Sequence, residues 1–192
     1  MGKLVMSEFV TLDGVIQDPA GNEGFRLGGW VGRVGDNVRA DTDTVLLDQA
    51  LGTEALLLGR RSYEFLAALW PSRSGELAER LNSLPKYVVS STLEHPAWNN
   101  STVLSGEVVD EVSKLKHELD GEINVIASFQ LGRTLIEHDL LDELRLMVLP
   151  VVLGAGERLF GETSDTKSMR LLDTRAVGDG VAYLTYELVR EA

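Results

Sequence analysis

The sequence contains no cysteine and carries fewer basic than acidic side chains. Without cysteine the chain can form no disulfide, has no thiol nucleophile and cannot hold zinc through thiolates. Lysine and arginine together number 18 against 30 aspartate and glutamate residues, which gives a formal net charge of -12. Nucleic acids and anionic membrane surfaces need a cationic face on their partner, so this charge argues against either as a partner.

Long apolar runs are also missing from the chain. None approaches the roughly 18 consecutive residues of a membrane-spanning helix, and residues 1–7 show no secretory signal. We therefore expect a cytoplasmic protein that does not act in a membrane. Aromatic residues make up only 6% of the chain, but 44% of its residues are hydrophobic and 25% are charged, a globular composition. With no repeat or linker in its 192 residues, the chain is predicted to be a single domain over residues 1–192.

Strands and helices alternate through the first two thirds of the sequence. Strands are predicted at residues 3–10, 55–58, 86–90, 102–104 and 122–127, and helices at 36–51, 60–69, 76–84, 107–119 and 129–137. This alternation is typical of an α/β fold with a largely parallel sheet and helices on both faces.

The last third of the chain changes character. Branched residues fill the predicted strand 143–153, and Pro150 inside it favours an edge position or a bulge. Predicted strands at 170–177 and 181–189 flank a three-residue hairpin turn, Gly178-Asp179-Gly180. We therefore expect a mixed sheet that is mostly parallel and ends in antiparallel C-terminal strands.

A glycine-rich segment, residues 17–35, follows the first strand and contains Phe25 and Trp30. A loop of this length is either a mobile lid or a plain surface excursion. The two aromatic side chains are candidate walls for a planar substrate, and hydrophobic anchoring of the loop is the alternative.

Small, hydroxylic or basic residues follow three of the predicted strands. They are Gly59-Arg60-Arg61-Ser62, Ser90-Ser91-Thr92 and Ala127-Ser128-Phe129. Ligands of α/β sheets bind at the carboxyl ends of strands, and helix N-termini favour phosphate. Two adjacent arginines in such an acidic chain indicate a ligand with more than one phosphate. The alternatives are solvated arginines that pair with the many acidic residues, a serine-rich turn that caps itself, and a plain helix N-cap at Ser128.

Several longer segments share one resemblance. Residues 57–64, 87–92, 140–146 and 150–160, together with 11–14 and Trp70-Pro71, resemble the reductase domain of the bifunctional riboflavin-biosynthesis deaminase-reductase. The resemblance covers nearly the whole chain and implies the three-layer fold of dihydrofolate reductase. The zinc-dependent deaminase half of that family is absent, because its metal site needs cysteines. No metal site is expected here.

The resemblance implies NADPH as the cofactor. It implies that Gly59, Arg60, Arg61 and Ser62 hold phosphates and that Ser90, Ser91 and Thr92 flank the ribose with the 2′-phosphate. It also implies that Ala127 and Ser128 face the pyrophosphate, with the bulky Phe129 beside them in the cofactor site. Val10 and Ile16 would lie near the nicotinamide. Ala127 stands where the family has glycine, whose missing Cβ lets the backbone approach phosphate closely. The extra methyl is either tolerated or weakens the cofactor site.

A hydride reductase can be assisted by a group that donates a proton. Candidates are Asp13, in a Leu-Asp-Gly turn after the first strand, and Tyr63 and Glu64. For Asp13 the alternative is that the carboxylate caps its own turn. The acid that dihydrofolate reductases carry on a helix would fall among Asp36, Asp41, Asp43 and Asp48, and the sequence does not choose among them.

Two functions follow from the sequence and its resemblance. The first is an NADPH-dependent reductase of a small pterin-like or ribosylaminopyrimidine-like substrate, similar to 5-amino-6-(5-phosphoribosylamino)uracil reductase. The second is a non-catalytic dimeric protein that kept the reductase fold and binds another ligand or none. Because the family typically pairs through its sheet, a homodimer is expected in both cases.

Overall fold

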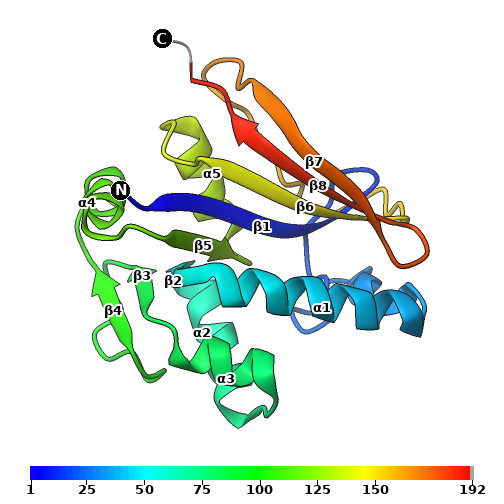
Figure 1. The fold of residues 1–192 in the computed structure, drawn as a ribbon, viewed down its shortest axis with the longest axis horizontal. Helices are drawn as coiled ribbons and strands as arrows, with labels where there is room; N and C mark the ends of the chain where they lie inside the picture. Colours follow the sequence, from blue (N-terminus) through cyan, green and yellow to red (C-terminus); the bar gives the residue numbers. More distant parts are fainter. Residues whose placement is uncertain (191–192) are drawn as a thin grey trace. The chain divides into compact units, whose positions relative to one another are not determined.

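The computed structural model describes residues 1–190, apart from the side chains of residues 36–40. Its strands form a mixed eight-stranded sheet in the order β4-β3-β2-β5-β1-β6-β8-β7 (Figure 1). The strands are β1 (Lys3–Thr11), β2 (Thr53–Gly59), β3 (Lys86–Val89), β4 (Ser101–Leu104), β5 (Glu122–Ile126), β6 (Glu143–Leu149), β7 (Met169–Val177) and β8 (Val181–Leu188). The α-helices are α1 (Asp36–Gly52), α2 (Arg60–Leu69), α3 (Glu76–Ser83), α4 (Val108–Glu118) and α5 (Phe129–Glu137). The predicted α/β fold with antiparallel C-terminal strands is confirmed.

The described chain falls into two compact units. The first unit contains residues 1–6 and 46–142, and the second begins with residues 7–45 and resumes at residue 143. Strand β1 and helix α1 each contribute residues to both units. That the whole chain forms one domain stays a prediction. Within residues 1–190, no helix is both long enough and apolar enough to cross a membrane.

Parallel strands form the sheet of the first unit. Strand β2 pairs in parallel with both β3 and β5, and β3 pairs in parallel with β4. Gly59 at the end of β2 lies opposite Val89 at the end of β3, and Leu57 lies opposite Val125 near the end of β5. The carboxyl ends of these strands therefore reach the same edge, as the alternation of strands and helices predicts.

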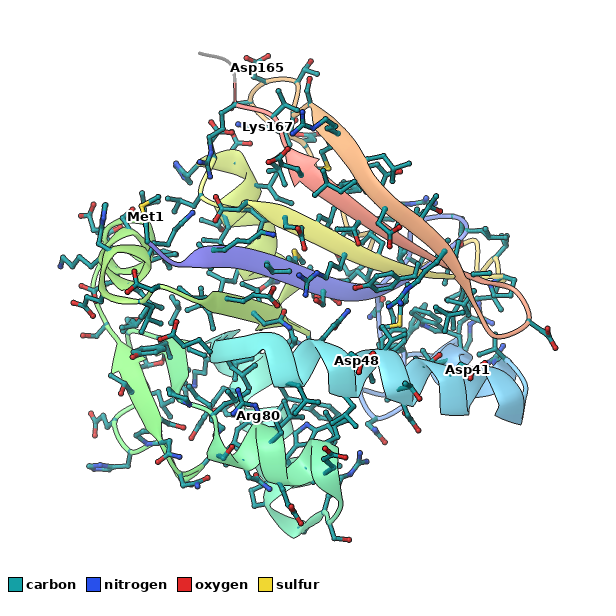
Figure 2. All side chains as sticks on the ribbon, viewed as in Figure 1. Met1, Asp41, Asp48, Arg80, Asp165 and Lys167 are labelled. Carbon is teal, nitrogen blue, oxygen red and sulfur yellow. The ribbon has the colours of Figure 1, made fainter. Side chains whose placement is uncertain are left out.

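The core of the first unit packs around β2. Its buried members are Ala50, Leu56, Leu58, Tyr63, Leu66, Leu81, Leu84, Val88 and Trp98. Arg80 of α3 donates to the carbonyls of Ala50, at 3.0 Å, and Thr53, at 2.6 Å, which ties α3 to the junction of α1 and β2 (Figure 2). Burial of each large apolar side chain contributes about 1.5–3 kcal/mol.

Antiparallel strands form the sheet of the second unit. Strand β8 pairs with β6 on one side and with β7 on the other. In Figure 1, β6 is yellow, β8 is red and β7 is orange. The strand predicted at 143–153 is too long, because β6 ends at Leu149. Pro150 has no N–H to donate to a ladder, so it stops the strand. The prediction of an edge or a bulge at Pro150 is wrong, since β6 has a neighbour on each side and the sheet edge is β7.

Candidate functional site

Two strand ends of the first unit, those of β2 and β5, are joined by hydrogen bonds between their own polar groups. The Ser128 hydroxyl, after β5, accepts from the Gly59 N–H at 3.1 Å and donates to the Ile126 carbonyl at 3.0 Å. The Ser62 hydroxyl, in the first turn of α2, donates to the carbonyl of Ala127. These bonds hold the β2–α2 and β5–α5 junctions next to each other, as the sequence predicts for a ligand site.

Two helix N-termini therefore meet at this edge of the sheet. The first turns of α2 and α5 are described in full. In neither helix does a side chain cap the N-terminus, and neither first turn contains an acidic residue. Ser128 occupies the N-cap position of α5 as predicted, but its hydroxyl accepts from Gly59 and does not cap the helix. The first N–H groups of a helix have no intrahelical acceptor and lie at the positive end of its dipole. The arrangement suits a ligand with two phosphates.

The two adjacent arginines are used differently. Arg60 donates to Glu64 at 2.9 Å through Nε and to the hydroxyl of Thr92 through its terminal nitrogen. It therefore links α2 to the turn after β3. Arg61 is exposed and forms no hydrogen bond or ion pair with any described part of the chain. Its guanidinium is available to an anionic ligand.

The three hydroxyl residues of the turn after β3 also differ in their contacts. Ser90 is 8% exposed, and its hydroxyl accepts from the N–H groups of Thr92 and Leu93, so it caps its own turn. Thr92 accepts from Arg60. Ser91 is exposed, and its hydroxyl has no hydrogen-bond partner within the described residues. The self-capping interpretation therefore applies to Ser90, and a ligand-binding role for Ser91 and Thr92 stays a prediction.

Ala127 adopts the left-handed backbone conformation, with φ of 52°, and is exposed. An L-residue with a Cβ pays roughly 1–2 kcal/mol for this conformation, whereas glycine does not. The backbone angle alone therefore favours glycine at position 127, apart from the space that a Cβ takes. Phe129, the next bulky residue, is half-buried, and the Arg133 guanidinium lies 5.0 Å from its ring centre.

Asp13 lies in the second unit, and both of its carboxylate oxygens accept hydrogen bonds. One carboxylate oxygen accepts from the Thr11 hydroxyl at 2.7 Å and from Leu153 N–H at 3.2 Å, and the other accepts from Gly154 N–H at 2.8 Å. The Thr11 hydrogen bond, helped by the backbone N–H groups, lowers the pKa of Asp13 to about 2. A carboxylate in this state donates no proton at neutral pH. The contacts favour the turn-capping interpretation.

The other candidate acids have different places. Tyr63 is 2% exposed, and its hydroxyl accepts from the Trp98 N–H at 2.9 Å. Glu64 forms the ion pair with Arg60. On α1, Asp41, Asp43 and Asp48 are all exposed, and Figure 2 marks the first and last of them. The side chain of Asp36 lies outside the described residues.

The glycine-rich loop is built around a carboxylate that the sequence analysis missed. Asp18 is 2% exposed and accepts from the N–H groups of Asn22 at 2.7 Å, Glu23 at 3.0 Å and Phe25 at 3.1 Å. An aspartate followed by Pro19 and then by glycines is a turn signal that could have revealed it. The loop is therefore held by hydrogen bonds from its own backbone to the buried Asp18 carboxylate.

The remaining predicted site residues also belong to the second unit. Trp30 has no exposed surface, and its indole N–H donates to the Gln17 carbonyl at 2.8 Å, which fits the anchoring alternative and not a substrate wall. Phe25 is half-buried beside Gly156, where φ is 118° and a Cβ would come within 3.0 Å of the ring. Val10 and Ile16 are each 5% exposed.

Comparison with known proteins agrees with this architecture. YyaP of Bacillus subtilis is 28% identical over 193 residues, covering 96% of this chain and 94% of its own length. A structure from Shewanella sp. PV-4, named for riboflavin biosynthesis, has a TM-score of 0.77 at 23% identity and covers 98% of this chain and 99% of its own.

Dihydrofolate reductase from Enterococcus faecalis, in complex with NADP(H), has a TM-score of 0.58 at 15% identity, with 97% of this chain and 96% of that chain covered. This likeness supports the predicted dihydrofolate reductase-like fold. The model of the RibD C-terminal domain matches residues 2–183. The chain belongs to the family of RibD C-terminal domains.

Proposed function

We propose that this protein is an NADPH-dependent reductase that transfers hydride to a small pterin-like or ribosylaminopyrimidine-like substrate. The observation that carries the proposal is the pair of helix N-termini, at Arg60 and Phe129, held together by Ser62 and Ser128. Arg61 and Ser91 add a cation and a hydroxyl that the described fold does not use. Membership of the RibD C-terminal family supports the proposal.

The donor set fits a phosphorylated dinucleotide. N–H groups at the starts of α2 and α5 would bind the pyrophosphate, and Arg61 and Ser91 would bind the phosphate at the adenosine end. When bound, the cofactor supplies the hydride, and the protein supplies binding and orientation. Arg60 orients this site through Thr92 and does not itself need to contact the ligand.

The test is NADPH binding, measured by calorimetry and by the thermal midpoint. Arg61→Ala removes a charge-assisted contact, so we expect affinity to fall about 10- to 100-fold, with a smaller fall for Ser91→Ala. Arg73→Ala, which removes an exposed arginine stacked on Trp70, is the matched control and leaves affinity unchanged. If saturating NADPH leaves the midpoint of the wild-type protein unchanged, the proposal fails.

Ala127 and Asp13 favour a second candidate function, a non-catalytic protein that kept the fold and binds another ligand or none. A methyl stands at the glycine position, and the Asp13 carboxylate is ionised at neutral pH. Ala127→Gly separates the two candidates. For the non-catalytic protein this substitution creates no measurable NADPH affinity, whereas a large gain identifies a reductase with a weakened cofactor site.

The exposed edge strand supports the homodimer that we also propose. On β7, Leu171 and Leu172 are 48% and 49% exposed, and the strand has a ladder partner on one side only, β8, within the described sheet. Such an edge can pair with another copy of the chain. Sedimentation equilibrium is expected to give a dimer, and a strict monomer at micromolar concentration contradicts it.

A further inference from the structure

Lys86, at the start of β3, is a lysine with no exposed surface. Its ammonium donates to three backbone carbonyls, of Leu84 at 2.8 Å, Asn82 at 3.0 Å and Asn99 at 3.2 Å. It also lies 4.3 Å from the ring centre of Trp98. Lysine is rarely buried completely, because an ammonium loses several kcal/mol of hydration unless other groups replace the water. Here the lost water is replaced by carbonyls from the segments before and after β3 and by the Trp98 ring.

Trp98 is held from three directions. Its backbone N–H donates to the Tyr63 hydroxyl at 2.9 Å, and its indole N–H donates to the Asn82 side-chain oxygen at 2.7 Å. The rings of Tyr63 and Trp98 lie 6.3 Å apart. Trp98 therefore receives contacts from α2, α3 and β3 at once, and only 2% of its surface is exposed.

These contacts fix the segment 90–100, which connects β3 to β4. Arg60 binds the start of this segment through Thr92, and Tyr63 binds its end through Trp98. Arg60 and Tyr63 are three residues apart in α2, so they lie on one face of the helix. The segment carries Ser91, the uncommitted hydroxyl of the candidate site, and helix α2 carries Arg61.

We propose that Lys86, Trp98 and Tyr63 are positioning residues, an interior clamp that places Ser91 and Thr92 for the adenosine end of the dinucleotide. The proposal rests on the proposed function of the strand-end site. An apolar side chain could fill the position of Lys86 without a hydration cost. A group with several donors can bind the end of α3 and residue 99 at once, and this is what the ammonium does.

Two variants test the clamp. Lys86→Met keeps the length of the side chain and removes its donors, and Tyr63→Phe removes only the hydroxyl that holds Trp98. The probes are adenosine 2′,5′-bisphosphate and reduced nicotinamide mononucleotide, with binding measured by calorimetry. We expect affinity for the adenosine probe to fall about 10-fold in both variants and affinity for the nicotinamide probe to stay within about twofold. Amide hydrogen exchange should accelerate at residues 91–99.

Lys116→Met is the matched control. Lys116 is the second buried lysine of the first unit, 5% exposed, and its ammonium bonds to Asp142 at 2.6 Å and to the Leu140 carbonyl at 2.9 Å. Its loss also destabilises the fold, but it is expected to leave exchange at 91–99 and affinity for the adenosine probe unchanged. Equal weakening by Lys116→Met would show a general stability effect and overturn the clamp.

The outcomes separate the clamp from the proposed function. A wild-type protein that binds neither NADPH nor the adenosine probe contradicts the proposed function, and amide exchange at 91–99 still decides whether the clamp exists. Wild-type binding with unchanged affinity in both variants overturns the positioning role. If Lys86→Met does not fold, Tyr63→Phe alone decides, because it leaves the ring packing in place.

Discussion

The glycine-rich loop of the second unit and the strand ends of the first unit both gather polar groups, but they use them in opposite ways. In the loop, the carboxylate of Asp18 accepts three backbone N–H groups. Just before the loop, the carboxylate of Asp13 binds the backbone of residues 153–154. At the strand ends, Ser62 and Ser128 bond to the backbone, while Arg61, Ser91 and two helix N-termini keep donors to spare.

The balance of donors and acceptors explains the difference. N–H groups of the same loop bind the Asp18 carboxylate, and N–H groups of residues 153–154 bind the Asp13 carboxylate, so both carboxylates stabilise the fold and have little capacity left for a ligand. At the strand ends donors outnumber acceptors, so an incoming anion completes the hydrogen bonding. Polar residues that look alike in the sequence therefore stabilise the fold in one unit, and in the other they leave donors for the anionic ligand that we propose.

The largest expected effect comes from Asp18→Ala. The substitution leaves the N–H groups of Asn22, Glu23 and Phe25 without their acceptor, so we expect the free energy of unfolding in urea to fall by about 3 kcal/mol. Glu23→Ala, at an exposed position in the same loop, is the control and should cost less than about 0.5 kcal/mol. Similar losses in the two variants would break the comparison, since the loop would not depend on its buried carboxylate.

Lys86 extends the comparison to a buried cation. Burial lowers the pKa of Lys86 to about 8, below its usual value of 10.5. The unfolded chain then binds more protons than the folded chain between these values, so stability rises as pH increases from about 8 to about 10.5. The gain is at most about 3 kcal/mol. The gain is measured by urea unfolding across this pH range. The free energy of unfolding of Lys86→Met is subtracted from that of the wild type at each pH.

A flat difference between the two proteins over that range would mean that the ammonium is as well accommodated inside as in water. The three carbonyls and the Trp98 ring would then offset its whole loss of hydration. Lys114→Met, at an exposed position with a Glu111 partner, controls for the loss of a lysine charge and is expected to show no such slope.

Asp13 gives a smaller effect of the same sign, because stability again rises with pH, here in the acid range. Its pKa is lowered to about 2 in the folded protein, from 3.8, so its stabilising contribution is complete above about pH 4 and is lost as pH falls toward 2. Because solvent screens this partly exposed group, we expect a contribution of about 1 kcal/mol. Asp13→Asn should remove that part of the acid transition. An unchanged acid profile in the variant would mean that other carboxylates hold the turn.

Most of the fold is predictable from the sequence, because apolar spacing and turn residues mark the elements directly. The helix expected at 107–119 is observed as α4, Val108–Glu118, and the run Ala55 to Leu58 lies within β2. The exception, β6, shows why boundaries are harder. Branched residues continue past Pro150, but the missing N–H ends the ladder at Leu149.

The candidate site is less predictable, because the same residue types are used in two ways. Residue type marks Arg60 and Arg61 equally, and only the approach of Thr92 to α2 shows that one of them is already engaged. Asp18 and Lys86 escape sequence analysis for a related reason. Charged residues are usually exposed, and the carbonyls and N–H groups that permit their burial come from backbone geometry, which no side-chain pattern encodes.

Ala127→Gly has the smallest expected effect and tests the strand ends directly. Glycine removes the cost of the left-handed conformation, roughly 1–2 kcal/mol, but gives the unfolded chain about 0.4–1 kcal/mol more conformational freedom. We therefore expect the free energy of unfolding in urea to rise by about 0.5–1 kcal/mol in Ala127→Gly. Ala155→Gly, at an exposed turn position without a positive φ, is the control and should be neutral or destabilising. If both substitutions destabilise equally, the strand end after β5 is not strained at Ala127.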